Sequence, residues 1–166
     1  KEHEYLILDG NLTQETINYL IIKYPEKKFI VDGTSSTKVL KFNDVLRHLY
    51  LLKINVYEAQ ALVKTNLTKE DLINALKQRG LTKVIVTQGK NDIYYLDDGK
   101  VKVSQIEATE EIENATGAGD AMLAGITYGL IKGKSLDEAL NYGKKLSSLT
   151  IKTSNAVNKN LNMKMI

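Results

Sequence analysis

Apolar residues follow two different spacings along this chain, and each spacing predicts one type of secondary structure. Short apolar runs bounded by polar residues predict β-strands at residues 5–8, 29–31, 49–52, 83–87, 93–96 and 101–103. Apolar residues three or four positions apart predict helices at residues 13–24, 55–63, 69–77, 118–131 and 136–151. Because strands alternate with helices, the pattern predicts an α/β fold with a mostly parallel sheet flanked by helices.

Two local signals add detail to this pattern. Residues 97–100 read Asp-Asp-Gly-Lys, and an Asp-Gly pair between two short strands predicts a β-hairpin. Ser135 and Glu138 have the spacing of a capping box, which predicts that the last helix begins at Leu136.

Composition limits the domain organisation and the chemistry. A chain of 166 residues predicts one domain, residues 1–166, that is large enough to bury a core without covalent staples. The chain has no cysteine, which excludes disulfides, zinc–thiolate sites and cysteine nucleophiles and is compatible with the cytoplasmic location that we expect. Its two histidines, His3 and His48, lack the spacing of a metal site.

Charge gives no indication of a polymeric or membrane partner. The formal net charge of +3 comes mainly from lysines spread along the chain, although residues 144–164 are locally basic. We expect no nucleic-acid partner, because the chain has no dense basic stripe with interleaved aromatic residues. We also expect no membrane association, because no apolar run reaches the length of a membrane helix. The first residues lack the charge order of a signal peptide and an initiator methionine, so we expect the chain to begin within a longer protein.

The segment at residues 114–120, Asn-Ala-Thr-Gly-Ala-Gly-Asp, carries the strongest chemical signal. Gly117 and Gly119 let the backbone turn tightly, so that successive N–H groups converge at the positive end of the following helix, where an anion binds. Asp120 falls in the first helical turn, and a carboxylate beside a phosphate suits a base that accepts a proton from an attacking hydroxyl. A flexible helix start with an acidic residue for the helix dipole explains the same residues without a ligand.

Two further segments lie where predicted strands end, which is where open parallel sheets bind ligands. Asn55 and Glu58 lie at a strand-to-helix junction, and their spacing also fits a capping box that needs no ligand. Thr87 and Gly89 lead a buried strand into a glycine turn, and a plain strand-to-turn junction is the better explanation of this segment when it is taken alone. The order and spacing of the three segments therefore count for more than any one of them.

Together these segments resemble the PfkB, or ribokinase-like, family of carbohydrate kinases, over nearly all of the chain and over the C-terminal half of family members. The resemblance implies a ribokinase-like fold in which this chain is the C-terminal nucleotide-binding part and the N-terminal half is absent. In that family the turn formed by Gly117, Ala118 and Gly119 holds the γ-phosphate of ATP, and Asp120 is the catalytic base.

The resemblance also implies which residues hold the cofactors. The residues that it places beside the nucleotide are Thr87, Gly89, Asn55, Asn114 and Thr116. Asn55 and Glu58 are further assigned to Mg²⁺ and phosphate, through water, although Ile54 replaces the proline that the family has between Lys53 and Asn55. A monovalent cation near residues 155–158 is an additional cofactor that the family allows.

Weaker similarities point to the pseudouridine kinase branch of the family. That branch has the pattern Asp-x-x-Ser-x-x-Lys at a strand end, which Asp32, Ser35 and Lys38 match, and Asp9 and Asn11 end the preceding strand. Asn114 in place of the usual aspartate points the same way. So do residues 149–161, which carry a lysine where the branch has proline. An alternative that involves no substrate is that Ser35 is a helix cap and Lys38 a surface lysine.

The expected function is transfer of the γ-phosphoryl group of ATP to a primary hydroxyl of a sugar or nucleoside. Two alternatives stay open: an ATP-binding fragment without turnover, and a non-catalytic nucleotide-binding or structural module. The small-molecule acceptor is the expected partner, and homo-oligomerisation is left open. Two other nucleotide motifs fail on spacing, because Tyr128 occupies the first glycine position of a Walker A loop and Met122 the third of a dinucleotide fingerprint.

Overall fold

The computed structural model describes residues 3–106 and 113–161, which belong to two compact units. The first unit comprises residues Lys1–Ile106 and the second comprises residues Glu107–Ile166. Each unit is described by itself below.

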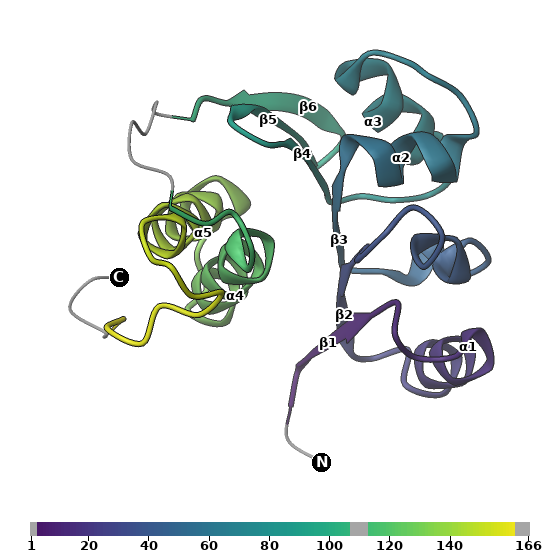
Figure 1. Ribbon diagram of the computed structural model, residues 1–166. Helices are drawn as coiled ribbons and strands as arrows, with labels where there is room; N and C mark the ends of the chain where they lie inside the picture. Colours follow the sequence, from purple (N-terminus) through teal and green to yellow (C-terminus); the bar gives the residue numbers. More distant parts are fainter. Residues whose placement is uncertain (1–2, 107–112, 162–166) are drawn as a thin grey trace. The chain divides into compact units, whose positions relative to one another are not determined.

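The first unit contains a six-stranded sheet in which the strands follow one another in chain order, as Figure 1 shows. Its strands are β1 (Tyr5–Asp9), β2 (Lys28–Asp32), β3 (Leu51–Asn55), β4 (Val84–Gln88), β5 (Asn91–Asp97) and β6 (Lys100–Ser104). Strands β1 to β4 are parallel, and β5 and β6 add an antiparallel hairpin. The predicted mostly parallel sheet is therefore confirmed, and the carboxyl ends of β1 to β4 share one edge.

The helices of the first unit lie on one face of this sheet (Figure 1). They are α1 (Gln14–Lys23), the 3₁₀ segments η1 (Val39–Phe42) and η2 (Leu46–His48), α2 (Val56–Val63) and α3 (Lys69–Gln78). Alternate strand residues point to this face and pack against the apolar stripes of the helices. The resulting core includes Phe29, Val31, Leu52, Ile54, Val84 and Val86 from the strands and Ile17, Ile21, Ala59, Leu62, Leu72 and Leu76 from the helices.

Two features of the first unit differ from the sequence prediction. Strand β3 begins at Leu51 rather than at Leu49, because the Leu49 amide donates to the Leu46 carbonyl and closes the 3₁₀ turn η2. The segments η1 and η2 were not predicted. The predicted hairpin is confirmed: Asp98 and Gly99 have φ angles of 46° and 76°, and such a turn matches the twist of β5 and β6.

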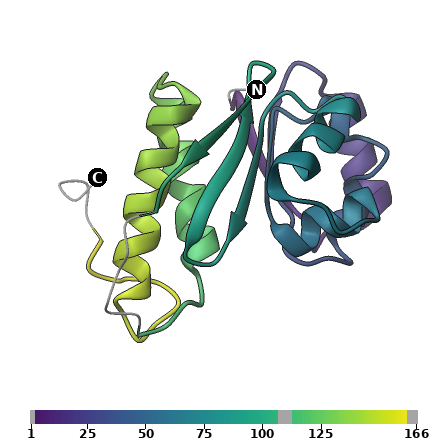
Figure 2. The same cartoon turned by 90° about the horizontal axis from the view of Figure 1, so that it is seen from above.

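The second unit consists mainly of two helices that lie side by side in Figure 2, α4 (Ala118–Ile131) and α5 (Leu136–Ile151). Glycines allow the two backbones to approach closely. A Cβ atom at Gly129 would lie 2.7 Å from the Ala139 Cα, and one at Gly125 would lie 2.6 Å from the Tyr142 carbonyl oxygen. The predicted capping box at Ser135 is present, and α5 begins at Leu136 as expected.

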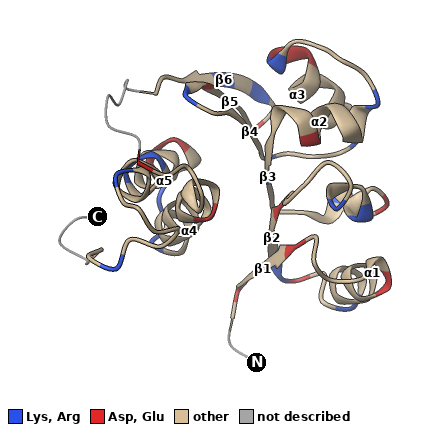
Figure 3. Ribbon diagram, viewed as in Figure 1, with Lys and Arg blue, Asp and Glu red and all other residues tan. Residues whose placement is uncertain are grey.

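Acidic and basic positions are interspersed over the helices of both units (Figure 3). Within residues 3–106 and 113–161, the structure contains no helix with the length and apolar character that crossing a membrane requires.

Candidate functional site

Asn55 and Glu58 form a reciprocal capping box at the carboxyl end of β3. The Glu58 amide donates to the Asn55 side-chain oxygen at 3.0 Å, and the Asn55 amide donates to Glu58 Oε2 at 2.9 Å. In addition, Asn55 Nδ2 donates to Glu58 Oε1 at 2.8 Å. The structural interpretation of this motif is therefore correct, and the cap fixes both side chains at the edge of the sheet.

The Glu58 carboxylate is held in a confined place. The residue is 4% exposed, and this burial raises the pKa of its carboxyl group, whereas the hydrogen bond from the Asn55 amide lowers the pKa in part. A Cβ atom at Gly33 would lie 2.5 Å from Glu58 Oε2 and 2.8 Å from the Ile54 side chain. Glycine at position 33 therefore leaves room for the carboxylate.

Next to this carboxylate lies a mostly buried ion pair that the sequence analysis did not identify. Lys53 Nζ donates to Asp32 Oδ2 at 2.9 Å, and the two side chains are 9% and 15% exposed. Asp32 ends β2, and its register partner in β3 is Lys53. The sequence signal for this ion pair is Lys53, which lies inside the apolar run of residues 51–54, because a buried charge requires a partner of opposite charge.

These carboxylates fit an outer-shell role toward Mg²⁺ better than direct ligation. The described residues contain no group of three or more His, Cys, Asp or Glu side chains that could hold a metal ion. Each Glu58 oxygen accepts one hydrogen bond and keeps a second lone pair, which a metal-bound water can use. Mg²⁺ usually keeps several of its waters and takes phosphate oxygens as ligands, so this donor set is compatible with the ion.

The end of β4 lies beside the capping box. Thr87 is the register partner of Asn55, and its hydroxyl donates to the Ile54 carbonyl at 3.4 Å. Gly89 turns the chain into β5 with a φ of 54°, and a Cβ atom there would meet nothing within 4 Å. The first unit therefore brings Asn55, Glu58 and Thr87 to one edge of the sheet. Gly89 follows directly after the last residue of β4.

Two of the segments that resemble pseudouridine kinases, residues 9–11 and 32–38, meet at the ends of β1 and β2. Lys38 Nζ donates to Asn11 Oδ1 at 2.6 Å, and Asn11 donates from its backbone and its side chain to the Asp9 carboxylate. Ser35 Oγ accepts a hydrogen bond from the Lys38 amide at 3.2 Å, as expected for a local cap. The two strand ends are thus joined by one hydrogen-bonded network.

In the second unit, the glycine segment leads directly into α4. Gly117 precedes the helix with φ 81° and ψ −7°, a left-handed conformation that favours glycine. Its Cβ atom would collide with the Ala156 carbonyl oxygen and would lie 2.9 Å from the Ala156 carbonyl carbon. Gly117 is therefore required both by its backbone conformation and by the loop that packs on it.

Asn114 stabilises the approach to this turn. Its side-chain oxygen accepts a hydrogen bond from the Thr116 amide at 2.9 Å, and its Nδ2 donates to the Ser154 carbonyl at 3.1 Å. The Asn158 side chain donates to the Leu149 carbonyl at 2.9 Å and so holds the C-terminal loop against α5. These contacts pre-organise the turn that ends at Gly117.

The helix start offers free amides and an exposed acid. The Ala118 amide closes a turn on the Ala115 carbonyl at 3.3 Å, and the Ala121 amide donates to Gly117 within the helical pattern. No residue in the described part of the chain accepts from the amides of Gly119 or Asp120. Asp120 lies exposed in the first turn of α4. Free amides at a helix N-terminus bind anions through their hydrogen bonds and the helix dipole.

Comparison with known proteins identifies the family. The model of the pfkB family of carbohydrate kinases matches residues 10–163. The pseudouridine kinase of Escherichia coli K12 is 27% identical over 150 residues, which cover 88% of this chain and 48% of that protein.

Solved structures agree with this match. A putative sugar kinase from Clostridium perfringens superposes with a TM-score of 0.86 at 28% identity, over 97% of this chain and 52% of that chain. Ribokinase from Thermotoga maritima has the same fold, with a TM-score of 0.79 at 21% identity over 92% of this chain and 52% of that chain. The chain spans about half the length of these relatives. Its sequence and its fold show that it belongs to the pfkB family of carbohydrate kinases.

Proposed function

We propose that this chain is the nucleotide-binding part of a kinase that transfers the γ-phosphoryl group of ATP to a primary hydroxyl of a sugar or nucleoside. The observation that carries the proposal is the start of α4, where the amides of Gly119 and Asp120 have no acceptor among the described residues and the Asp120 carboxylate is exposed. Membership of the pfkB family supports the kinase activity.

In the proposed reaction, Asp120 orients the acceptor hydroxyl and takes its proton. The hydroxyl oxygen forms a bond to the γ-phosphorus while the bond from that phosphorus to the β,γ-bridging oxygen breaks, and ADP leaves. Phosphoryl transfer passes through a loose transition state, so positioning and donors that meet charge on the phosphoryl oxygens contribute more than early proton removal. The amides of Gly119 and Asp120 are the proposed donors together with that of Gly117, and the Ala118 amide joins them if its 3.3 Å turn opens.

In the first unit, Thr87 and Gly89 are the residues that we propose for contact with the nucleotide. In the second unit they are Asn114 and Thr116. Bound Mg²⁺ would supply positive charge that neutralises the phosphates of the nucleotide. Asn55 and Glu58 are the residues that would orient its waters, and the capping box holds them ready for that task. A monovalent cation near the loop at residues 155–158 remains a further prediction of the family resemblance.

The acceptor that we propose is pseudouridine. Two observations support it: the similarity to the pseudouridine kinase of Escherichia coli, and the network of Asp9, Asn11 and Lys38 at the ends of β1 and β2. The second candidate is an ATP-binding chain without turnover. It is supported by the extent of the match, which covers about half the length of the relatives.

Two experiments separate these candidates. The first measures the thermal midpoint of this chain with Mg·ATP and with AMP, because a ligand that binds only the folded state raises the midpoint. A rise with Mg·ATP alone supports a site for the terminal phosphates, and no rise with either nucleotide contradicts both candidates.

The second experiment measures phosphorylation of pseudouridine and of ribose by a protein of full family length that contains this chain. We expect Asp120→Asn to lower kcat by roughly 10²- to 10⁴-fold, because a general base contributes about that factor. Asp98→Asn is the matched control, since it removes an exposed carboxylate from the hairpin turn. An Asp120→Asn variant as fast as the control would show that Asp120 is not the base.

A further inference from the structure

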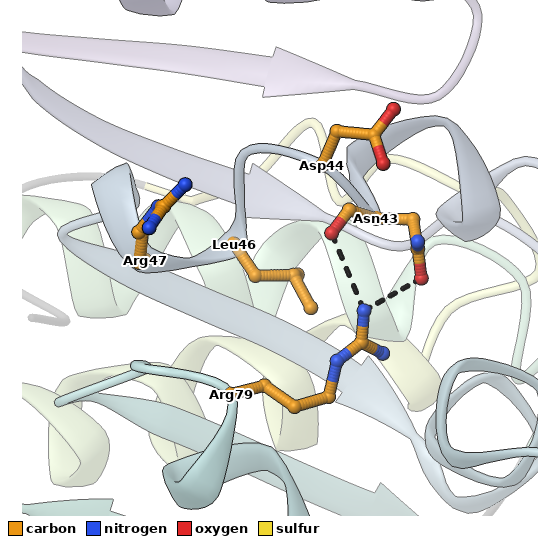
Figure 4. A pocket seen from close by; sticks show the side chains of 5 residues that line it. All are labelled: Asn43, Asp44, Leu46, Arg47 and Arg79. Carbon is orange, nitrogen blue, oxygen red and sulfur yellow. Dashed lines mark hydrogen bonds between the residues drawn. The ribbon is translucent and has the colours of Figure 1, made fainter.

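Both arginines of the chain line one cavity in the first unit, far from the edge where β3 and β4 end. Arg47 lies in η2 and Arg79 caps the end of α3, and the other lining residues are Asn43, Asp44 and Leu46 (Figure 4). The chain has 23 lysine and arginine residues, and only Arg47 and Arg79 are arginines. The cavity has a volume of about 230 Å³.

The Arg79 guanidinium is fixed in place by neutral acceptors. Its Nη1 donates to the Leu62 carbonyl at 2.9 Å, and its Nη2 donates to Asn43 Oδ1 at 2.6 Å and to the Asn43 carbonyl at 3.3 Å. These three bonds leave further N–H groups of the guanidinium without a partner in residues 3–106 and 113–161. Because every acceptor is uncharged, they hold the side chain without compensating its charge.

Arg47 is exposed, and within the described ranges it takes part in no hydrogen bond or ion pair. The nearby carboxylate does not neutralise either arginine: Asp44 Oδ2 accepts a hydrogen bond from Gln14 Nε2 at 3.1 Å, and Figure 4 shows it pointing away from the Arg79 guanidinium. The cavity is therefore lined by two arginines whose charges no carboxylate among the described residues balances.

We propose that this cavity is a binding site for a small phosphate-bearing anion. Arginine presents a planar fork of donors that matches phosphate oxygens, and two arginines that line one cavity supply two such forks. At neutral pH a phosphate monoester carries a charge of about −1.5 to −2, which two guanidinium groups balance. A volume below the roughly 300 Å³ of common ligand pockets suits inorganic phosphate or a small phosphate ester better than a whole nucleotide.

The site is separate from the proposed nucleotide site. Arg47 precedes β3 and Arg79 precedes β4, whereas Asn55 and Thr87 lie at the other ends of these two strands. A five-residue strand is roughly 16 Å long. An anion in this cavity therefore does not compete with a nucleotide at the carboxyl edge, and the proposal does not depend on the proposed function.

The test uses the side-chain Nε–H signals of the two arginines in ¹⁵N NMR spectra of this chain, because Arg47 and Arg79 give the only two signals of this kind. Inorganic phosphate is titrated at constant ionic strength, with sodium chloride as the reference salt. We expect both signals to shift and saturate with phosphate and to stay unchanged with chloride. Equal shifts with both salts, or no shift, would overturn the proposal.

Variants and related anions sharpen this test. Arg47→Gln should weaken phosphate binding by about tenfold, since a charge-assisted pair is lost, whereas Lys145→Gln on α5 removes the same charge elsewhere and should leave binding unchanged. Equal effects of the two variants would reduce the site to general electrostatics and overturn it. Tighter binding of glycerol 3-phosphate than of inorganic phosphate would indicate that the natural ligand is an organic phosphate ester. Tighter binding of inorganic phosphate would indicate free phosphate. Binding of succinate as tightly as either phosphate compound would refute the phosphate assignment.

Discussion

Substitution of alanine for Gly117 tests the turn that precedes α4, and the chain provides a matched control. Gly117 and Gly133 both have left-handed backbones, with φ of 81° and 73°. Alanine in this conformation costs about 1–2 kcal/mol at either position. The surroundings differ, because a Cβ atom at Gly117 would collide with the Ala156 carbonyl, whereas one at Gly133 would meet nothing within 4 Å.

The collision sets the expected difference between the two variants. Ala156 offers backbone atoms rather than the end of a flexible side chain, so the loop that carries it must move. Overpacking of this kind costs about 1–3 kcal/mol. We therefore expect Gly117→Ala to lower the free energy of unfolding by about 2–5 kcal/mol and Gly133→Ala by about 1–2 kcal/mol.

Urea unfolding followed by far-ultraviolet circular dichroism measures both changes, with the free energy extrapolated linearly to water. The midpoint should fall much further for Gly117→Ala than for Gly133→Ala while the slopes stay similar. If both variants lose the same free energy, the contact between the turn and the C-terminal loop does not constrain the glycine, and the reasoning is refuted.

Three further changes test other parts of the structure. Gly129→Ala should lower the free energy of unfolding by about 1–3 kcal/mol in the same assay, because its Cβ atom would lie 2.7 Å from the Ala139 Cα; an unchanged midpoint would show that α4 and α5 do not pack this closely. The Ser135 amide and hydroxyl lower the pKa of Glu138, so its charge stabilises the fold above the ordinary carboxyl pKa of 4.5, and this stabilisation is lost as pH falls through the lowered pKa. The difference in unfolding free energy between wild type and Glu138→Gln should therefore shrink on acidification. A difference that stays constant would contradict this. Asn55→Ala should cost about 1 kcal/mol through the lost cap, and Asn55→Ser should restore stability; if Asn55 also organises Mg²⁺, Asn55→Ser will still weaken Mg·ATP binding measured by calorimetry, whereas full recovery would leave the cap as its only role.

Much of the fold could be predicted because its signals are local. The start of α5 follows from the capping box of Ser135 and Glu138, and the hairpin of β5 and β6 follows from its Asp-Gly turn. Helix α4 has the predicted bounds, because its apolar run begins directly after a glycine that ends the turn. Such signals act over a few residues and need no knowledge of the tertiary structure.

The segments η1 and η2 could not be predicted for the opposite reason. Their apolar residues, among them Val39, Phe42 and Leu46, are fully or almost fully buried, but they follow neither the helical nor the strand spacing. The segment η1 packs against α1 and α2, and the sequence pattern does not reveal these contacts. The segment η2 ends just before β3, so that this strand begins at Leu51. Arg47, which lines the cavity, also lies in η2.

The candidate site was predictable in its residue types and less so in its contacts. The sequence located Asn55, Glu58 and Thr87 at strand ends, where parallel strands share one edge. The pairing of Asp32 with Lys53 depends on the register of β2 and β3. Contacts between residues distant in sequence, such as those of the C-terminal loop with Gly117, likewise depend on the folded structure.

The central claim is that the amides at the start of α4 hold the terminal phosphoryl group of ATP. It is tested most directly by the backbone ¹⁵N–¹H signals of Gly117, Gly119 and Asp120 in this chain, recorded with Mg²⁺ and either ADP or the non-hydrolysable ATP analogue AMP-PNP. We predict that these signals shift with AMP-PNP and stay in place with ADP, because only the analogue carries a γ-phosphoryl group. Signals that respond equally to both nucleotides, or to neither, would contradict the account.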